Sequence, residues 1–331
     1  MERFALAAAV VLGFALTAAL CSLFVPLRRV LERREQNQQP AQSEQPRPVP
    51  LRAPLWGGLC AAAGTVAAVG VGWLAACVGQ PELLGSEGRL MTRLLTALAG
   101  SLAFGAVGLA EDLARMRSPA ALGLRRDVRL LLEALAAAFV LLLLQAAGCL
   151  PRGLDVPGAG YVLLGSAVPF LWAVLMVALA ECARIAERDE GTVCGAAFVA
   201  MLALMMAEAG LGVPGLAVLP AALAGALVAL LLWAFPPARL GVGCCGSLLA
   251  AGAIGCIPLS LDMTSLTVPL ALPFWAAGGL WAAQLLGAKR TGKPLRCWVK
   301  KHKMSPETVF LCSFALSAVG YVLALALLRW C

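Results

Sequence analysis

Ten apolar segments of about 20 residues each dominate this sequence and constrain its fold more than any other feature. A helix of about 20 residues is long enough to cross a hydrocarbon core of roughly 30 Å. An open β-sheet could not cross, because lipid offers no partner for unpaired backbone groups. The chain is 61% hydrophobic and only 13% charged, whereas soluble domains are about half apolar and about a quarter charged. The sequence therefore predicts an all-α, polytopic membrane bundle with about ten transmembrane helices.

The apolar runs define one membrane domain over residues 1–331, with no internal repeat and no second domain. Two longer connections interrupt it: a Gln- and Pro-rich loop at 28–53, which we expect to be flexible, and a basic loop at 289–307. The spans are predicted at 4–26, 55–77, 91–111, 129–149, 160–182, 192–210, 216–235, 245–262, 266–288 and 308–328.

Basic residues fix the predicted orientation. Of the 26 lysines and arginines, 21 fall in the odd-numbered connections between these spans, with Arg129 at the first position of the fourth span included. Cytoplasmic loops of membrane proteins carry the excess of basic residues. The odd-numbered connections are therefore predicted to be cytoplasmic, with both termini outside an inner membrane. The same rule accounts for the net charge of +8 without a nucleic-acid partner.

The twelve cysteines do not form a recognisable metal or disulfide pattern, since no CxxC pair occurs and most lie inside apolar runs. Buried cysteines commonly behave as small apolar residues. We expect this role here, including for the adjacent Cys244 and Cys245.

Two glycines, Gly57 and Gly58, follow Pro54 and Trp56 at the start of the second span. Proline suits a first helical turn, and glycines allow a neighbouring backbone or a ligand to approach closely. The pair indicates either helix packing or a substrate contact.

Glu111 and Asp112 lie side by side at the end of the third span, and Arg115 follows. Adjacent carboxylates at the end of a membrane helix are costly unless they face water, a cation or a partner. They would suit a Mg²⁺ ion or a proton transfer. Alternatively, Arg115 pairs with Asp112 on a solvated helix end.

An acidic segment at 184–191 lies between the fifth and sixth spans and includes Glu187 and Glu190. It is either a solvated turn or part of a site on the same membrane face. Together with cations on that face, such carboxylates indicate a phosphate-bearing substrate at the lipid surface.

The cationic loop at 289–307 contains Lys301, Lys303 and the only histidine of the chain, His302. Such a loop could bind phosphates through point charges and a titratable imidazole. It could equally contact anionic lipid head groups.

These clusters, in this order, resemble the phospho-N-acetylmuramoyl-pentapeptide transferases, which belong to the polyprenyl-phosphate N-acetylhexosamine-1-phosphate transferases (glycosyltransferase family 4). The family pattern TPTMGG resembles residues 53–58, and the paired aspartates of the family resemble Glu111 and Asp112. Further family stretches fall on residues 184–193, 237–247 and 284–307. The resemblance covers nearly the whole chain.

The resemblance implies transfer of phospho-N-acetylmuramoyl-pentapeptide, or a related phospho-sugar, from a UDP-sugar to undecaprenyl phosphate. The product would be lipid I of peptidoglycan synthesis, and Mg²⁺ would be required. By resemblance, the catalytic residues are Glu111, Asp112, Arg115 and His302, with Asp112 acting on the lipid phosphate. The substrate would contact Glu187, Glu190, Lys301, Lys303, Gly57 and Gly58, and the metal would be held by Glu187 and Glu190.

One departure from the family pattern bears directly on activity. The metal-binding aspartate of the family is replaced by Cys244, and Mg²⁺ prefers hard oxygen ligands to a soft thiolate. Two hypotheses follow: a working membrane transferase, or a catalytically impaired paralogue that acts as a lipid- or nucleotide-binding scaffold in cell-wall synthesis.

A transporter is a third class, which would place ionisable residues near the middle of the membrane. Only Glu133 and Glu208 are candidates, and no pair of broken helices is evident in the sequence. The glycines of the second span do not follow the GxxxG spacing that is typical of helix dimers. They therefore give no argument for a homodimer, and the oligomeric state stays open.

Overall fold

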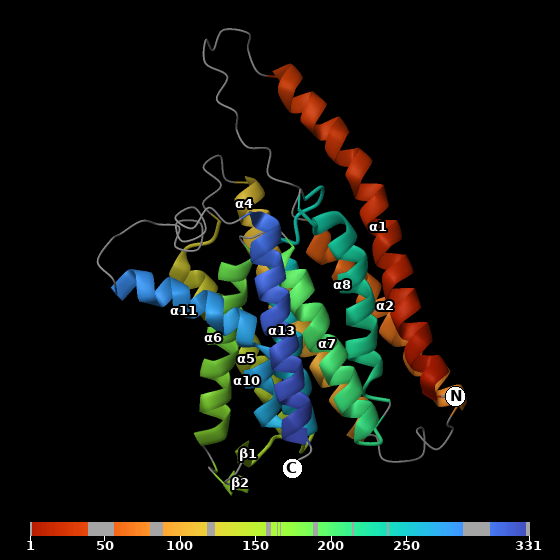
Figure 1. Ribbon diagram of the computed structural model, residues 1–331, viewed down its shortest axis with the longest axis vertical. Coiled ribbons are helices and arrows are strands. Elements are labelled where there is room, and N and C mark those ends of the chain that lie inside the picture. Colours follow the sequence, from red (N-terminus) through yellow and green to blue (C-terminus); the bar gives the residue numbers. More distant parts are fainter. Residues whose placement is uncertain are drawn as a thin grey trace.

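The computed structural model is a bundle of α-helices with one short β-hairpin (Figure 1). It describes residues 2–38, 56–79, 89–117, 123–156, 160–163, 165, 167–187, 191–213, 215–236, 238–286 and 305–328. The first helices are α1 (Glu2–Gln38), α2 (Gly57–Gly79), α4 (Arg89–Arg117) and α5 (Arg126–Ala146). After the hairpin, β1 (Gly153–Val156) and β2 (Gly160–Leu163), come α6 (Ala167–Ala186), α7 (Thr192–Gly210), α8 (Val218–Ala234) and α9 (Gly243–Leu261). The last elements are η1 (Thr264–Leu266), α10 (Thr267–Leu270), α11 (Leu272–Leu286) and α13 (Pro306–Leu328).

The helices confirm the predicted all-α membrane bundle. Within the described residues, seven helices are long and apolar enough to cross a membrane, and the bent pair of α10 and α11 would make an eighth. The remaining two predicted spans correspond to α8, which is apolar but has only 17 residues, and α5, which carries charged residues in its first two turns.

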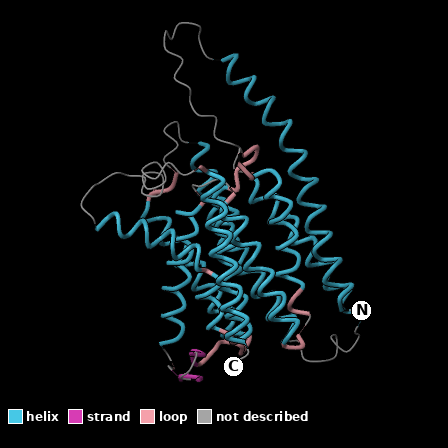
Figure 2. Tube along the Cα trace, viewed as in Figure 1, coloured by secondary structure: helices cyan, strands magenta, loops and turns pink. Residues whose placement is uncertain are grey.

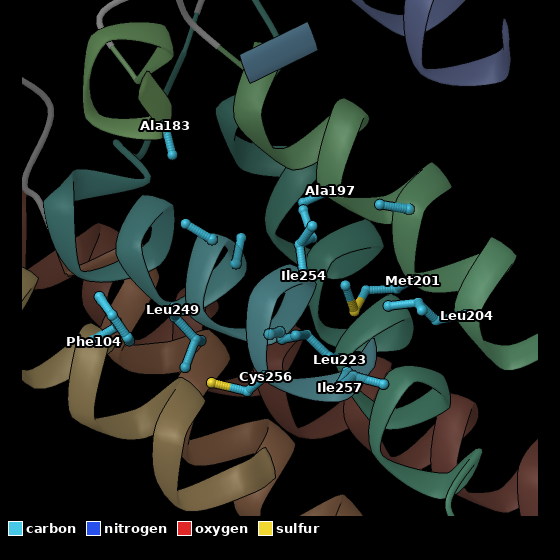
Figure 3. Close-up of a cluster of buried hydrophobic side chains, with 14 of the residues drawn as sticks. Phe104, Ala183, Ala197, Met201, Leu204, Leu223, Leu249, Ile254, Cys256 and Ile257 are labelled. Carbon is cyan, nitrogen blue, oxygen red and sulfur yellow. The ribbon is translucent and has the colours of Figure 1, made fainter. Parts of the chain in front are cut away.

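Helix α9 lies at the centre of the bundle, although it coincides with one of the shortest predicted spans. In the apolar stretch of α9, 94% of the residues are buried, against 17% in the apolar stretch of α13 at the periphery. Figure 3 shows Leu249, Ile254 and Ile257 of α9 among side chains of the surrounding helices, such as Phe104 of α4 and Met201 of α7. Many positions of α9 are Gly, Ala or Ser, and small residues let neighbouring helices approach closely in membranes.

The predicted span at 160–182 is wrong in its first residues. Residues 160–163 form β2, which pairs antiparallel with β1 from Gly153↔Leu163 to Val156↔Gly160, and α6 begins only at Ala167. Figure 2 shows this hairpin in magenta at the lower end of the molecule. Gly160 has φ 73°, a conformation that favours glycine and suits the turn between the strands.

The predicted continuous span at 266–288 is also wrong, because the chain bends by 63° between α10 and α11. Pro273 lies in the first turn of α11. Proline lacks the N–H that would continue the hydrogen bonding of the preceding helix, so a new helix axis starts there. In Figure 1, α11 accordingly runs across the bundle while α13 runs along it. This bent pair corrects the expectation that the chain contains no broken helices.

The start of α1 and the end of α13 both lie at the lower end in Figure 1, where the hairpin also lies. The hairpin joins the end of α5 to the start of α6. The start of α5 and the end of α6, which carry charged residues, therefore lie at the opposite end. That this charged end faces the cytoplasm stays a prediction.

Candidate functional site at the charged end of the bundle

The first turn of α9 is the point at which three of the predicted motifs meet. The backbone N–H of Gly57 donates to the carbonyl of Gly241 at 3.2 Å, and that of Gly58 to the carbonyl of Val242 at 2.9 Å. A Cβ atom on Gly58 would lie 2.1 Å from the backbone nitrogen of Gly246. The two glycines thus let α2 begin in direct backbone contact with the start of α9, while their predicted substrate contact stays a prediction.

Helix α4 approaches the same turn from another side. A Cβ atom on Gly108 would lie 2.2 Å from the carbonyl oxygen of Cys244. One turn further along α4, the carboxylate of Asp112 accepts the backbone N–H of Cys244 at 3.0 Å and that of Cys245 at 2.9 Å. Asp112 is buried, with a relative exposure of 1%. We call the contacts of Gly57, Gly58, Gly108 and Asp112 with residues 241–246 the α9 clamp.

Arg115 pairs mainly with Glu111 rather than with Asp112. Its Nη2 atom lies 2.6 Å from Oε1 of Glu111, whereas its Nη1 atom lies 3.8 Å from Oδ1 of Asp112. The pairing of Arg115 with Asp112, one of the alternatives for this motif, is therefore a secondary contact. The reason is geometric, because the oxygens of Asp112 face the N-terminus of α9.

Glu181 of α6 connects two arginines of different helices, and sequence reasoning did not identify it. It accepts from Nε of Arg129, on α5, at 2.7 Å and also accepts from Nη2 of Arg184, on its own helix. Arg129 Nη1 also lies 3.7 Å from Oε1 of Glu111. The signal in the sequence was a glutamate inside an apolar span, three residues before Arg184.

These contacts make one ion-pair chain that links α4, α5 and α6 through Arg115, Glu111, Arg129, Glu181 and Arg184. Glu133 of α5 lies beside it, with Oε1 3.9 Å from Nε of Arg129. Glu133 is fully buried, and neither of its carboxylate oxygens has a hydrogen-bond partner within the described part of the chain. Glu133 is thus part of the charged end and does not lie alone in mid-membrane, as a transporter residue would.

Glu187 lies directly after α6, next to the ion-pair chain. Burial is the main cause that raises the pKa of its carboxyl to about 7. The guanidinium of Arg115 opposes this rise, and the carboxylates of Asp112 and Glu111 add to it.

The described residues fit a Mg²⁺ site poorly. Mg²⁺ binds oxygen ligands in near-octahedral geometry, but both oxygens of Asp112 accept backbone N–H groups, and both oxygens of Glu181 accept from arginines. Cys244, which the motif resemblance aligns with the family's metal-binding aspartate, is fully buried. Among the residues that the structure describes, no group of three or more His, Cys, Asp or Glu side chains could hold a metal ion.

Several predicted site residues lie outside the described residues: Glu190, Lys301, His302 and Lys303. Their roles, and a metal site built from Glu187 and Glu190, stay predictions. What the structure brings together is Gly57, Gly58, Glu111, Asp112, Arg115, Glu187 and Cys244. Arginines paired with carboxylates at the end of an apolar bundle offer planar donor groups suited to phosphate oxygens.

Comparison with known proteins gives consistent matches. Residues 94–262 match the family model described as Glycosyl transferase family 4. A phospho-N-acetylmuramoyl-pentapeptide-transferase of Mycobacterium tuberculosis is 28% identical over 265 residues, which is 72% of each chain. The enzyme of the same name from Desulforudis audaxviator is 32% identical over 170 residues, 48% of this chain and 50% of the relative. That from Synechococcus sp. is 30% identical over 212 residues, 63% of this chain and 55% of the relative. These matches confirm the resemblance inferred from the motifs.

Proposed function

Because this chain belongs to glycosyl transferase family 4, we propose that it transfers a phospho-sugar from a UDP-sugar to undecaprenyl phosphate. The first candidate for the transferred group is phospho-N-acetylmuramoyl-pentapeptide, which would make lipid I for peptidoglycan synthesis. The site would face the cytoplasm from a bacterial inner membrane. The observation that carries the proposal is the convergence of α2, α4 and α9 at the α9 clamp, with Glu187 and the ion-pair chain beside it.

The arrangement suits this chemistry in physical terms. A polyprenyl chain is apolar and would lie along the membrane helices, whereas its phosphate would reach the charged end of the bundle. Guanidinium groups of Arg115, Arg129 and Arg184 are permanently charged and can neutralise phosphate oxygens. Mg²⁺ would supply further charge neutralisation if bound. Its described candidate ligand is Glu187 alone, so no step is assigned to the metal.

The direct test is release of UMP by the purified protein in detergent, given UDP-N-acetylmuramoyl-pentapeptide and undecaprenyl phosphate. The reaction is run with Mg²⁺ and with a chelator, beside a curated relative as an active control. Arg115→Ala is expected to lower the rate about a hundredfold or more, since a loss of positioning at such a site has effects of this size. Asp127→Asn, an exposed residue on α5, is the matched control and should leave the rate unchanged. Absence of UMP release beside the active relative would contradict the proposal.

A second candidate function is a non-catalytic scaffold that binds the lipid or the nucleotide. The observation that favours it is the buried thiol of Cys244 in place of the family's metal-binding aspartate. For this candidate, the protein should bind the UDP-sugar in equilibrium measurements without releasing UMP. UMP release that depends on Arg115 would exclude it.

A further inference from the structure

The N-terminus of α9 has no cap of its own. The first N–H groups of a helix lack partners within the helix and need acceptors from elsewhere. The residue before α9 is the apolar Val242, and no side chain from that position caps the helix. Gly243, with φ 72°, has no side chain to contribute. The cap is supplied by Asp112 from α4, 132 positions earlier in the chain.

Both carboxylate oxygens of Asp112 are used in this contact, one on each N–H group. A carboxylate at a helix N-terminus also interacts favourably with the helix dipole. The next cation, Nη1 of Arg115, lies 3.8 Å from Oδ1. Asp112 is also only 1% exposed, so its side chain is closed off from solvent in this structure.

We propose that Asp112 is a positioning residue, which holds the first turn of α9 against α4 and does not itself act on the substrate phosphate. This differs from the role that the family resemblance implies for it. The glycine contacts of the α9 clamp support the proposal, because Gly108 has no side chain to keep α4 away from Cys244. Only the activity part of the test below rests on the proposed function.

The first part of the test follows the thiols of the clamped turn. Cys244 and Cys245 are 0% and 2% exposed, and they lie in the turn that Asp112 holds. Asp112→Ala removes two hydrogen bonds to a charged acceptor, so the turn should open more often, and labelling of both thiols by N-ethylmaleimide should speed up roughly 10- to 100-fold. Residue-resolved mass spectrometry measures the rates. Cys256, buried more than three turns further along α9, is the internal control that should stay slow.

Asp112→Asn is the second variant, because it keeps one acceptor oxygen and should fold even where Asp112→Ala does not. It should give an intermediate labelling rate for Cys244 and Cys245. Unchanged labelling in both variants would overturn the proposal. A uniform increase that includes Cys256 would also overturn it, because the effect would then be global unfolding rather than loss of a local cap.

The second part of the test uses turnover. If Asp112 positions the turn, Asp112→Asn should lower kcat by roughly tenfold and leave the shape of the pH profile unchanged, since one of two hydrogen bonds remains. A group that takes part in the chemistry would instead show loss of at least about a thousandfold with normal thiol protection, and that result would overturn the proposal. If the parent protein has no activity, the proposed transferase function fails, whereas the thiol measurement still decides the role of Asp112.

Discussion

The α9 clamp and the ion-pair chain lie at the same end of the bundle and share α4, yet they are held together by different interactions. The clamp joins α2, α4 and α9 mainly by close backbone approach at glycines, to which the Asp112 carboxylate adds two hydrogen bonds. The ion-pair chain joins α4, α5 and α6 through long charged side chains, with N···O distances of 2.5 to 3.7 Å. One half of the site is therefore fixed mainly by shape and the other by charge.

This difference predicts which substitutions each half tolerates. Backbone packing leaves no space for even one additional carbon atom, because protein interiors are close-packed. Charged side chains can adjust their positions, but removal of one partner leaves another charge buried without compensation. The clamp should thus respond to volume, and the ion-pair chain should respond to charge.

The largest effect is expected for Gly58→Ala, which adds one methyl group at the clamp. Its Cβ would lie 2.1 Å from the backbone nitrogen of Gly246, which cannot move as a side chain could. We expect a loss of about 3 kcal/mol or more, seen as a fall of at least about 5 °C in the apparent melting temperature in detergent by tryptophan fluorescence. Gly70→Ala on the same helix is the matched control, because nothing lies within 4 Å of that position. Equal effects at both positions would show that helix propensity, not the clamp, is responsible.

The next largest effect is expected for Glu181→Ala in the ion-pair chain. The change leaves Arg129 and Arg184 without their hydrogen-bonded carboxylate. Breaking a fully buried pair costs about 3–5 kcal/mol, and we expect roughly 2–3 kcal/mol here, because the Glu181 side chain is 23% exposed. Glu181→Gln, which keeps an acceptor, should cost less. The same melting experiment measures both variants, with Asp127→Asn as the control. A Glu181→Ala protein as stable as the parent would contradict a structural role for the ion-pair chain.

A smaller, pH-dependent effect is expected for Glu187→Gln. The pKa of Glu187 is raised from 4.5 to about 7, so the folded state binds this proton more tightly than the unfolded state does. The stability that protonation supplies is complete below about pH 4.5 and is lost as the pH rises through about 7. Glutamine does not ionise, so the stability of the Glu187→Gln variant does not fall in this pH range. The variant should match the parent near pH 5 and melt at a higher temperature at pH 8, and an advantage independent of pH would count against a buried carboxyl.

The smallest effect is expected for Glu133→Gln. The Glu133 carboxylate is fully buried without a hydrogen bond, and its contact with Arg129 is long at 3.9 Å. Glutamine has the same shape as glutamate but no charge, so the substitution removes an unfavourable buried charge and only one long ionic contact. We expect an apparent melting temperature within about 2 °C of the parent. A fall as large as that of Glu181→Ala would show that Glu133 is a full member of the ion-pair chain.

The sequence predicted the bundle well because apolar length alone decides which segments can cross a membrane. It also predicted that Glu111, Asp112 and Glu187 belong to one site, since the order of the motifs resembled a known family. The bend between α10 and α11 and the strand at 160–163 were missed, because both lie inside runs whose hydropathy is uniform and only proline and glycine mark them.

The contacts that define the site were harder to predict. Asp112 and Cys244 are far apart in the chain, so neither residue indicates that one caps the helix of the other. Glu181 lies three residues before the charged segment 184–191, inside an apolar span. In both cases the function of the residue depends on a neighbour that only tertiary packing supplies.

The central place of α9 has a consequence for how the protein assembles. This helix touches α2, α4, α6 and α7, yet it follows all of them in the chain. Until α9 is made, the space between those four helices lacks its occupant. Final assembly therefore waits for residue 261. A chain cut short before that point would lack the helix that fills the interior shared by the other four.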